Sequence, residues 1–352
     1  EPCPTHDGRL SHERLERAAL RMAPAMSATS ELGRLKAELV ATLLERRGST
    51  GGFRALAVDA PEAETAEATA WSAVALSLAV PAAAARRAAA DSLARMQSPD
   101  GRLSTHPLHP GAYSPTSVAV LAWSADLRRD AERKRAVDFL LAHAGTTFVR
   151  DPESPLEMDT EIAGWPWIDR TFSWVEPTAM ALLALAAAGL AQHPRARAGR
   201  ALLFDRQLAS GGWNYGNARA FGAELRPAPE STGLVLAALA GAAPESRVER
   251  SLARLRVDLP RLRTPLAFAW SLLAASAWGR RPAPAETQSA IREILGRAAR
   301  YGGYETAELA LLLLALVAER GLLPAVSEMA EIAEIPASTE IAALKSAATD
   351  RP

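Results

Sequence analysis

The sequence is poor in cysteine, in aromatic residues and in excess charge, and each shortage excludes a class of protein. Cys3 is the only cysteine among 352 residues, so an internal disulfide or a cysteine-cluster metal site cannot form. Forty basic residues balance forty acidic ones, which argues against nucleic-acid binding, because that affinity depends on an excess of Lys and Arg. We therefore expect no nucleic-acid partner.

Long apolar runs are also missing. A membrane-spanning helix needs roughly 18 consecutive apolar residues, and the most apolar run, 309–321, is shorter and ends in charged residues. Because the chain begins with Glu1 rather than Met, removal of an upstream signal or tag is left open, and export with it. Otherwise we expect a soluble protein, cytoplasmic or peripheral to a membrane.

Helical periodicity is what the sequence has in abundance. Charged amphipathic segments alternate with segments that are apolar on all sides, and sustained period-2 alternation is absent. The amphipathic segments are 31–47, 86–97, 130–143, 196–208, 246–257 and 289–300, and the apolar ones are 68–78, 115–123, 177–185, 231–239, 263–273 and 305–316. A helix that is apolar all round must be buried.

This alternation predicts a closed ring, since an open array of helical hairpins would expose its end repeats. The predicted fold is all-α, an (α/α)6 toroid of six helical hairpins, with a two-domain helical chain as the alternative. We expect residues 1–30 to form an extension with a short helix, residues 31–320 to form the toroid, and residues 321–352 to form a C-terminal helix and tail.

Two signals recur within the hairpins. A glycine turn followed by a large residue ends four amphipathic segments, in 45–53, 96–103, 206–213 and 297–304. A threonine then opens each apolar segment, at Thr69, Thr116, Thr178, Thr232, Thr264 and Thr306. We expect these threonines to cap their helices. A small residue or proline follows each of them, which indicates close helix packing.

The turn in 200–213 resembles a repeat of the terpenoid cyclase and protein prenyltransferase superfamily. Its cyclases, squalene-hopene cyclase among them, carry a basic or small residue, an aromatic residue and then Gln-x-x-x-Gly-x-Trp. That pattern is matched here by Arg200, Phe204, Gln207, Gly211 and Trp213, and less fully by Gln97, Gly101 and Leu103. The resemblance covers roughly residues 31–320. It implies the toroid fold, with the glutamine as a structural staple between outer helices, and says little about function.

Two activities of related proteins are not expected. Protein prenyltransferases hold zinc with Asp, Cys and His, and Cys3 lies far from the predicted toroid. Complement-type thioester domains share the toroid but need Cys-Gly-Glu-Gln, which the chain lacks. We expect no cofactor.

The resemblance also implies a candidate acid. Cyclases that protonate their substrate use Asp-x-Asp-Asp before Thr-Ala, and the middle Asp donates the proton. Aligned through Thr178, the donor position falls on Glu176, while Trp174 and Pro177 replace neighbouring carboxylates. A lone glutamate is a general acid if burial raises its pKa. Protonation of an epoxide, or no proton transfer, then fits better than protonation of a bare alkene.

A structural role for Glu176 is the alternative. Glu67 and Glu230 also stand two residues before a helix-opening threonine, and acidic residues near helix N-termini are favoured by the helix dipole.

Three connections, 98–115, 144–177 and 210–230, are long and are predicted to lie on one rim. Long ordered loops are usually functional. With Glu176 and Glu230, the candidate catalytic carboxylates there are Asp159, Glu161 and Asp169. The candidate ligand-binding residues are Tyr113, Trp165, Trp167, Arg170, Trp174, Trp213 and Tyr215, together with Trp71 of the first apolar segment. Aromatic faces stabilise cations and stack on sugars, or they simply cover the core.

His106 and His109 are weak metal-ligand candidates, and we predict no metal centre. Three functions remain open. The favoured one is an atypical cyclase-like protein that binds an isoprenoid or other apolar ligand, with acid-initiated cyclisation or isomerisation as its reaction. The second is a carbohydrate-active hydrolase or lyase that uses rim carboxylates. The third is a non-catalytic toroid that binds a partner protein or a lipid, with peripheral membrane contact left open.

Overall fold

The computed structural model describes residues 31–56, 63–79, 83–149, 158–300 and 302–333. Cys3, the helix expected within 1–30 and the tail after residue 333 lie outside the described residues. The regular secondary structure of the described chain is helical apart from two short antiparallel hairpins, in which β1 (Phe53–Arg54) pairs with β2 (Glu64–Thr65) and β3 (Arg219–Ala220) with β4 (Ala223–Glu224).

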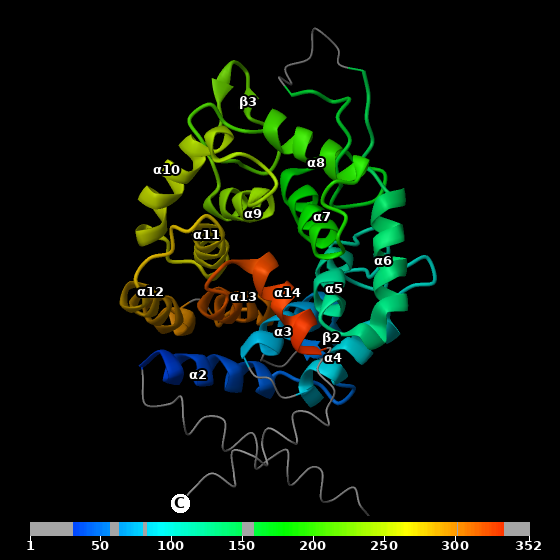
Figure 1. Ribbon diagram of the computed structural model, residues 1–352, viewed down its shortest axis with the longest axis vertical. Coiled ribbons are helices and arrows are strands. Elements are labelled where there is room, and N and C mark those ends of the chain that lie inside the picture. The colour runs from blue at the N-terminus through cyan, green and yellow to red at the C-terminus, as the bar shows by residue number, and fades with distance from the viewer. Residues whose placement is uncertain (1–30, 57–62, 80–82, 150–157, 301, 334–352) are drawn as a thin grey trace, which may run out of the picture.

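The helices form two concentric rings (Figure 1). The outer ring contains α2 (Glu31–Glu45), α4 (Ala83–Met96), α6 (Asp130–Ala142), α8 (Pro194–Asp205), α10 (Glu249–Asp258) and α12 (Pro284–Gly296). The inner ring contains α3 (Ala66–Ala79), α5 (Pro115–Ser124), α7 (Val175–Ala187), α9 (Pro229–Leu239), α11 (Pro265–Ala277) and α13 (Thr306–Val317). Single 3₁₀ turns are η1 (Leu127–Arg129), η2 (Glu245–Arg247), η3 (Leu259–Arg261) and η4 (Ala298–Arg300).

Both rings close. Each inner helix contacts the inner helices before and after it, and α13 at the end of the chain contacts α3 at its start. In the outer ring α12 contacts α2. The predicted all-α toroid of six hairpins is therefore confirmed.

Small residues allow the inner helices to pack closely. All ten residues of α5 are buried, as expected for a helix with no polar face. On α9, a Cβ at Gly233 would lie 2.6 Å from the backbone nitrogen of Ser271 on α11. Only glycine fits at that crossing.

The threonines that open the inner helices bind the preceding glycine turn. Oγ1 of Thr69, Thr116, Thr178 and Thr232 accepts the backbone N–H of Phe53, Leu103, Trp165 and Trp213, respectively, over 2.9, 2.9, 3.0 and 3.0 Å. The N-cap residues of α5, α7 and α9 make no side-chain cap bond. The predicted capping role is therefore wrong for these three helices, because each threonine lies inside the first turn and faces the neighbouring turn instead.

We expect Thr232→Val to lower the free energy of unfolding by about 1–3 kcal/mol, because a buried backbone group loses its partner. The Thr232 hydroxyl accepts from Trp213 N and donates to Trp213 O (3.1 Å), and Val keeps the shape without either bond. Chemical denaturation measures the loss. Thr264→Val is the matched control, since Thr264 is exposed and makes no cap bond. Equal losses for the two variants would contradict this role.

Glutamines join successive outer helices. Gln207 Nε2 donates to Arg247 O (3.2 Å) and to Ser251 Oγ (3.0 Å) of α10. Gln97 Nε2 donates to Gly101 O (3.0 Å) in its own turn and to Glu132 O (2.9 Å) on α6. These contacts are those of a structural staple, not of a ligand site.

Helix α14 (Leu322–Ala333) covers one end of the inner ring (Figure 1). It follows α13 at a bend of 81° and contacts α3, α5 and α7. On α14 itself, Leu322, Ala325 and Val326 are buried. The inner helices run parallel, so this end lies opposite the rim that carries the outer-to-inner connections.

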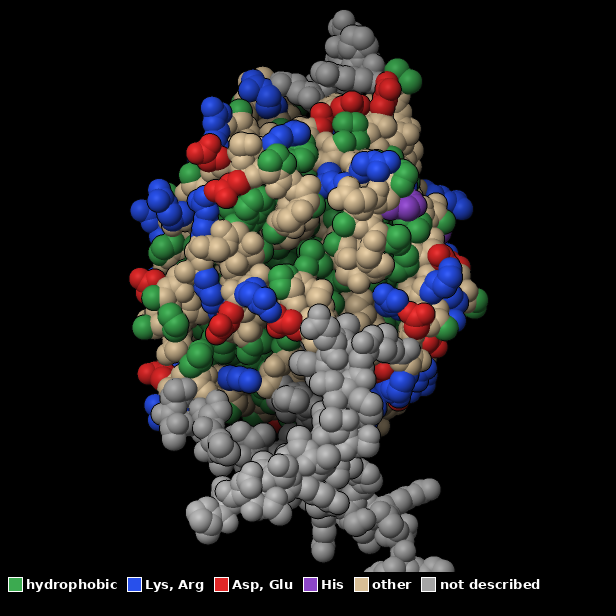
Figure 2. Space-filling model, in the orientation of Figure 1, with side chains coloured by type: hydrophobic (Ala, Val, Ile, Leu, Met, Phe, Trp, Pro, Cys, Tyr) green, Lys and Arg blue, Asp and Glu red, His purple; other side chains and the backbone are tan. Residues whose placement is uncertain are grey.

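Basic and acidic side chains are interspersed over the face seen in Figure 2, in keeping with the equal numbers of the two kinds. Within the described ranges, no single helix is long and apolar enough to cross a membrane. Among the described helices, only α13 together with Leu322–Glu328 meets the length and composition requirements, as a bent pair.

Candidate functional site

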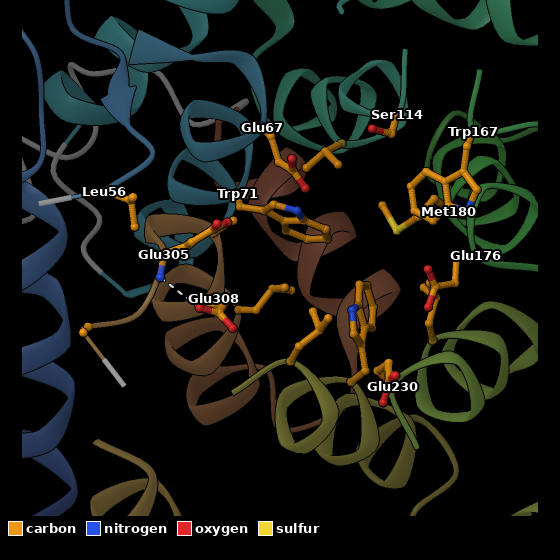
Figure 3. Close-up of a pocket in the computed structure, with 18 residues that line it drawn as sticks. Leu56, Glu67, Trp71, Ser114, Trp167, Glu176, Met180, Glu230, Glu305 and Glu308 are labelled. Carbon is orange, nitrogen blue, oxygen red and sulfur yellow. Dashed lines mark hydrogen bonds between the residues drawn. The ribbon is translucent and has the colours of Figure 1, made fainter. Parts of the chain in front are cut away.

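The inner ring encloses a cavity of about 640 Å³ near the rim of long connections. Its walls are mainly the first turns of inner helices and the loops that lead into them. Figure 3 looks into the cavity and shows a helix crossing behind its side chains. Apolar wall residues include Val118, Met180, Leu234, Leu266 and Leu311.

Glutamates face this cavity because the hairpins repeat in register. Glu67, Glu176 and Glu230 stand two residues before the buried Thr69, Thr178 and Thr232, and Glu305 stands one residue before Thr306. Glu67, Glu176 and Glu230 therefore lie in the first turns of α3, α7 and α9, and Glu305 lies at the start of α13. Figure 3 shows them in two groups, Glu176 and Glu230 on one side and Glu67, Glu305 and Glu308 on the other. We call these the α7–α9 pair and the α3–α13 group.

In the α7–α9 pair, Glu176 is the group suited to donate a proton. Burial raises the pKa of Glu176, a hydrogen bond from Ser231 Oγ (2.8 Å) lowers it, and the charge of Glu230 raises it, with a net increase. Tyr215 OH donates to Glu230 Oε1 (3.0 Å), and this bond raises the pKa of the tyrosine. Glu176 therefore keeps its proton to a higher pH than a solvated glutamate does.

The α3–α13 group is similarly crowded. The Glu67 side chain is exposed to the cavity, but the protein around it still desolvates its carboxylate. This desolvation raises the pKa of Glu67, and the charge of Glu305 raises it further. Burial also raises the pKa of Glu308, partly offset by a hydrogen bond from the backbone N–H of Glu305 (2.8 Å) and by the charge of Arg46. Buried Arg46 donates to Tyr304 O (2.8 Å).

Glu67→Gln should stabilise the protein relative to the wild type at high pH but not at low pH. The pKa of Glu67 is raised in the folded protein, so its favourable contribution is present below the unfolded pKa and is lost as the pH rises through the folded one. Gln has no such dependence. Free energies of unfolding of both proteins, measured across this titration range, test the difference, and a difference independent of pH would count against it.

Three tryptophans, Trp71, Trp167 and Trp270, also line the cavity. The rings of Trp71 and Trp270 are 5.6 Å apart between centroids and meet edge to face at 76°. Both are 4% exposed, whereas Trp167 at the mouth is 39% exposed. Aromatic faces of this kind attract cations.

The structure brings four of the predicted site residues to the cavity, namely Trp71, Trp167, Glu176 and Glu230. Tyr215 joins them through its hydrogen bond to Glu230.

The other predicted residues lie outside the cavity lining. Trp165 and Trp213 are buried between the rings, where their Nε1 atoms donate to Leu140 O (2.9 Å) and Leu203 O (2.6 Å). Tyr113 is buried against Phe139. Trp174 lines a smaller pocket of about 200 Å³ with Phe148 and Phe172. The remaining candidates, Asp159, Glu161, Asp169 and Arg170, belong to the 144–177 connection on the rim.

Glu305, Glu308 and Trp270 are not among the site residues predicted from the sequence, and Glu67 is interpreted from the sequence only as a helix-start residue. A partial signal was available, because Glu305 also precedes a helix-opening threonine, by one residue where the other glutamates stand two residues before theirs.

His106 and His109 are both exposed, and their ring centroids are 5.8 Å apart. Within the part of the chain that the structure describes, no group of three or more His, Cys, Asp or Glu residues could hold a metal ion.

Exposed large apolar side chains gather on the three long connections. They are Leu108, Phe148, Val149, Trp167, Ile168, Phe172, Tyr215, Phe221 and Leu225. Backbone hydrogen bonds join the connections to one another, from Asp169 N to Gly111 O (2.8 Å) and from Val175 N to Tyr215 O (3.0 Å). The rim beside the cavity mouth is therefore rich in exposed apolar surface.

No family model matches the sequence, and no curated protein is significantly similar to it. Its fold matches that of a single-substitution variant of the type II terpene cyclase MstE from Scytonema, with a TM-score of 0.55 and 15% identity over 89% of this chain and 99% of that one. Another variant of MstE is known in complex with its substrate, geranylgeranyl dihydroxybenzoate. A wild-type glycosidase matches with a TM-score of 0.52 and 17% identity over 84% and 98% of the two chains. Identities this low show the fold alone, and the chain accordingly has a terpene cyclase-like α/α toroid fold.

Proposed function

We propose that this protein is an atypical terpenoid-cyclase-like enzyme that binds an isoprenoid in its central cavity and uses Glu176 as a general acid. One observation carries the proposal. The carboxyl group of Glu176, with a raised pKa, lines a cavity whose walls, apart from its five glutamates, are mainly apolar and aromatic. Such a group retains the proton that an acid-initiated cyclisation or isomerisation needs.

The size and walls of the cavity support an apolar ligand. A volume of about 640 Å³ lies within the range of small-molecule sites, roughly 300–1,000 Å³. Leu234, Leu266 and Leu311 would cover the hydrocarbon chain, each buried Å² of apolar surface contributing about 25 cal/mol. The exposed apolar side chains of the rim give such a ligand a surface along which to reach the mouth.

The proposed reaction begins with the proton of Glu176. Glu176 protonates an epoxide oxygen of the substrate, the adjacent C–O bond breaks, and an internal alkene supplies the electrons of a new C–C bond. The resulting carbocation is stabilised by the faces of Trp71 and Trp270. The carbocation loses a proton to a carboxylate such as Glu230. Glu230 then releases this proton to water and Glu176 takes one up from water, so both carboxyl groups return to their starting states. Substrate and product are isomers.

An epoxide suits Glu176 better than a bare alkene. Glu176 accepts a hydrogen bond from Ser231 and lies beside the charge of Glu230. These two neighbours do not make its carboxyl group a strong acid. An epoxide oxygen is far more basic than an alkene carbon, so it accepts a proton from a weaker acid.

The test is conversion of epoxy-isoprenoids of increasing chain length, followed by gas chromatography with mass detection. The proposal predicts a cyclic or rearranged alcohol of unchanged mass with the wild type and none with Glu176→Gln. Absence of conversion and of binding across the series would overturn it.

A carbohydrate-active enzyme is the second candidate, favoured by carboxylates on two opposite sides of one cavity (Figure 3). Glu176 would again be the acid, and a member of the α3–α13 group the base or nucleophile. The cavity lining within the described chain, however, has no Asn, Gln, His, Lys or Arg to bind sugar hydroxyls. Release of the aryl group from aryl glycosides, abolished by Glu176→Gln, would favour this candidate over the first.

A further inference from the structure

The α3–α13 group lies across the cavity from Glu176, and the proposed proton transfer does not use it. Glu67 and Glu305 line the cavity on neighbouring inner helices, where the charge of Glu305 raises the pKa of Glu67. Within the described chain neither makes an ion pair. Glu308 does have a basic neighbour, Arg46, whose Nη1 is occupied by Tyr304 O and Thr306 Oγ1 (3.2 Å).

Such an arrangement is unfavourable in the empty protein. Like charges repel more strongly in a cavity walled by protein than in bulk water, and low-dielectric walls focus the negative potential. No basic side chain of the described residues lines the cavity, so only Arg46 behind Glu308 and the positive N-terminal ends of the inner helices offset that potential. A positively charged ligand group would offset it.

Aromatic rings supply the second half of a cation site. Trp71 lies four residues after Glu67 on α3, so both side chains are on the same face of that helix. Figure 3 shows the Trp71 ring between the carboxylates of the α3–α13 group and the opposite wall of the cavity. The Trp270 ring packs edge to face against it. Carboxylates with indole faces suit an organic ammonium group. No described cluster of ligands suits a metal ion.

We infer that the ligand of the cavity carries a positively charged nitrogen, as a protonated amine or a quaternary ammonium, held by Glu67, Glu305 and the face of Trp71. The apolar part of the ligand extends along Leu234, Leu266 and Leu311 toward Glu176. This inference rests on the proposed function, because it assumes that the cavity binds an apolar ligand. It narrows that ligand to a cationic, amine-bearing one.

Three probes of equal chain length test the inference: octyltrimethylammonium, octanol and octyl sulfate. Quenching of tryptophan fluorescence and isothermal titration calorimetry measure their binding. We expect the ammonium probe to bind about tenfold more tightly than octanol, since a desolvated cation–π contact and ion pairing add to burial of the chain. Octyl sulfate should bind more weakly than octanol.

The double variant Glu67→Gln/Glu305→Gln should remove the preference for the ammonium probe and leave octanol binding unchanged. Glu249→Gln is the matched control, because Glu249 is exposed in the first turn of outer helix α10. If the double variant does not fold, binding of the probes to Glu67→Gln, and the effect of added salt on their binding to the wild type, provide the same test. Salt should weaken binding of the ammonium probe and not of octanol.

Equal binding of octyltrimethylammonium and octanol to the wild type would overturn the inference and leave the proposed function standing. Retention of the preference in the glutamine variants would also overturn it. If none of the three probes binds, the proposed function fails together with the inference.

Discussion

Glu176→Gln is expected to lower kcat by about 10²–10⁴-fold, the contribution typical of a general acid. Gln has nearly the shape of Glu and can still accept the hydrogen bond of Ser231 Oγ, so the cavity should keep its form. Ligand affinity should therefore change little. Steady-state rates and binding constants measured on the same preparation separate the two effects.

The pH dependence of the wild-type rate provides a second readout. Burial raises the pKa of Glu176, and only its protonated form is the acid. The rate should therefore fall as the pH rises through that pKa. Glu249→Gln, on the outer ring, should keep the wild-type rate and profile. Full activity of Glu176→Gln, or loss of ligand binding equal to its loss of rate, would remove the assigned role.

Trp213→Ala is expected to lower the free energy of unfolding by about 3–5 kcal/mol, as for other large-to-small changes in a packed core. Trp213 is 0% exposed. Its Nε1 donates to Leu203 O on α8, and its backbone N–H donates to Thr232 on α9. The variant leaves a cavity where the outer ring, the glycine turn and the inner ring meet. Chemical or thermal denaturation measures the loss.

Trp167→Ala is the matched control for that experiment. Trp167 is 39% exposed at the mouth of the cavity, so its loss should cost little stability and should weaken ligand binding. Trp213→Ala should lower stability strongly and leave ligand binding unchanged, when binding is measured at a temperature where this variant stays folded. Similar stability losses in the two variants would contradict the division between structural and ligand-facing tryptophans.

The ring could be predicted from the sequence because its cause is local. Helices that are apolar on all sides alternate with amphipathic ones, and only a closed arrangement buries every apolar helix. The role of the threonines could not be predicted in the same way. A threonine at a helix start is compatible with capping, and the sequence does not show that the N–H of Trp213 lies within reach of Thr232.

Prediction of the site was limited by long-range geometry. Glu176 and Glu230 stand at the ends of long loops, which are typical of functional sites, whereas Glu305 follows a short connection. Glu305 meets Glu67 only because α13 packs against α3 when the ring closes. Trp213 and Trp167 both lie in rim connections, and their sequences do not show which indole points between the rings and which faces the cavity.

Native mass spectrometry of the protein with geranylgeraniol tests the central claim, that the inner ring holds an apolar ligand. Leu234 lines the cavity from α9, so Leu234→Trp should fill it, and Glu249→Gln should leave it unchanged. The account predicts a 1:1 adduct for the wild type and Glu249→Gln and a much weaker one for Leu234→Trp. No adduct with the wild type, or an equal adduct with Leu234→Trp, would contradict it.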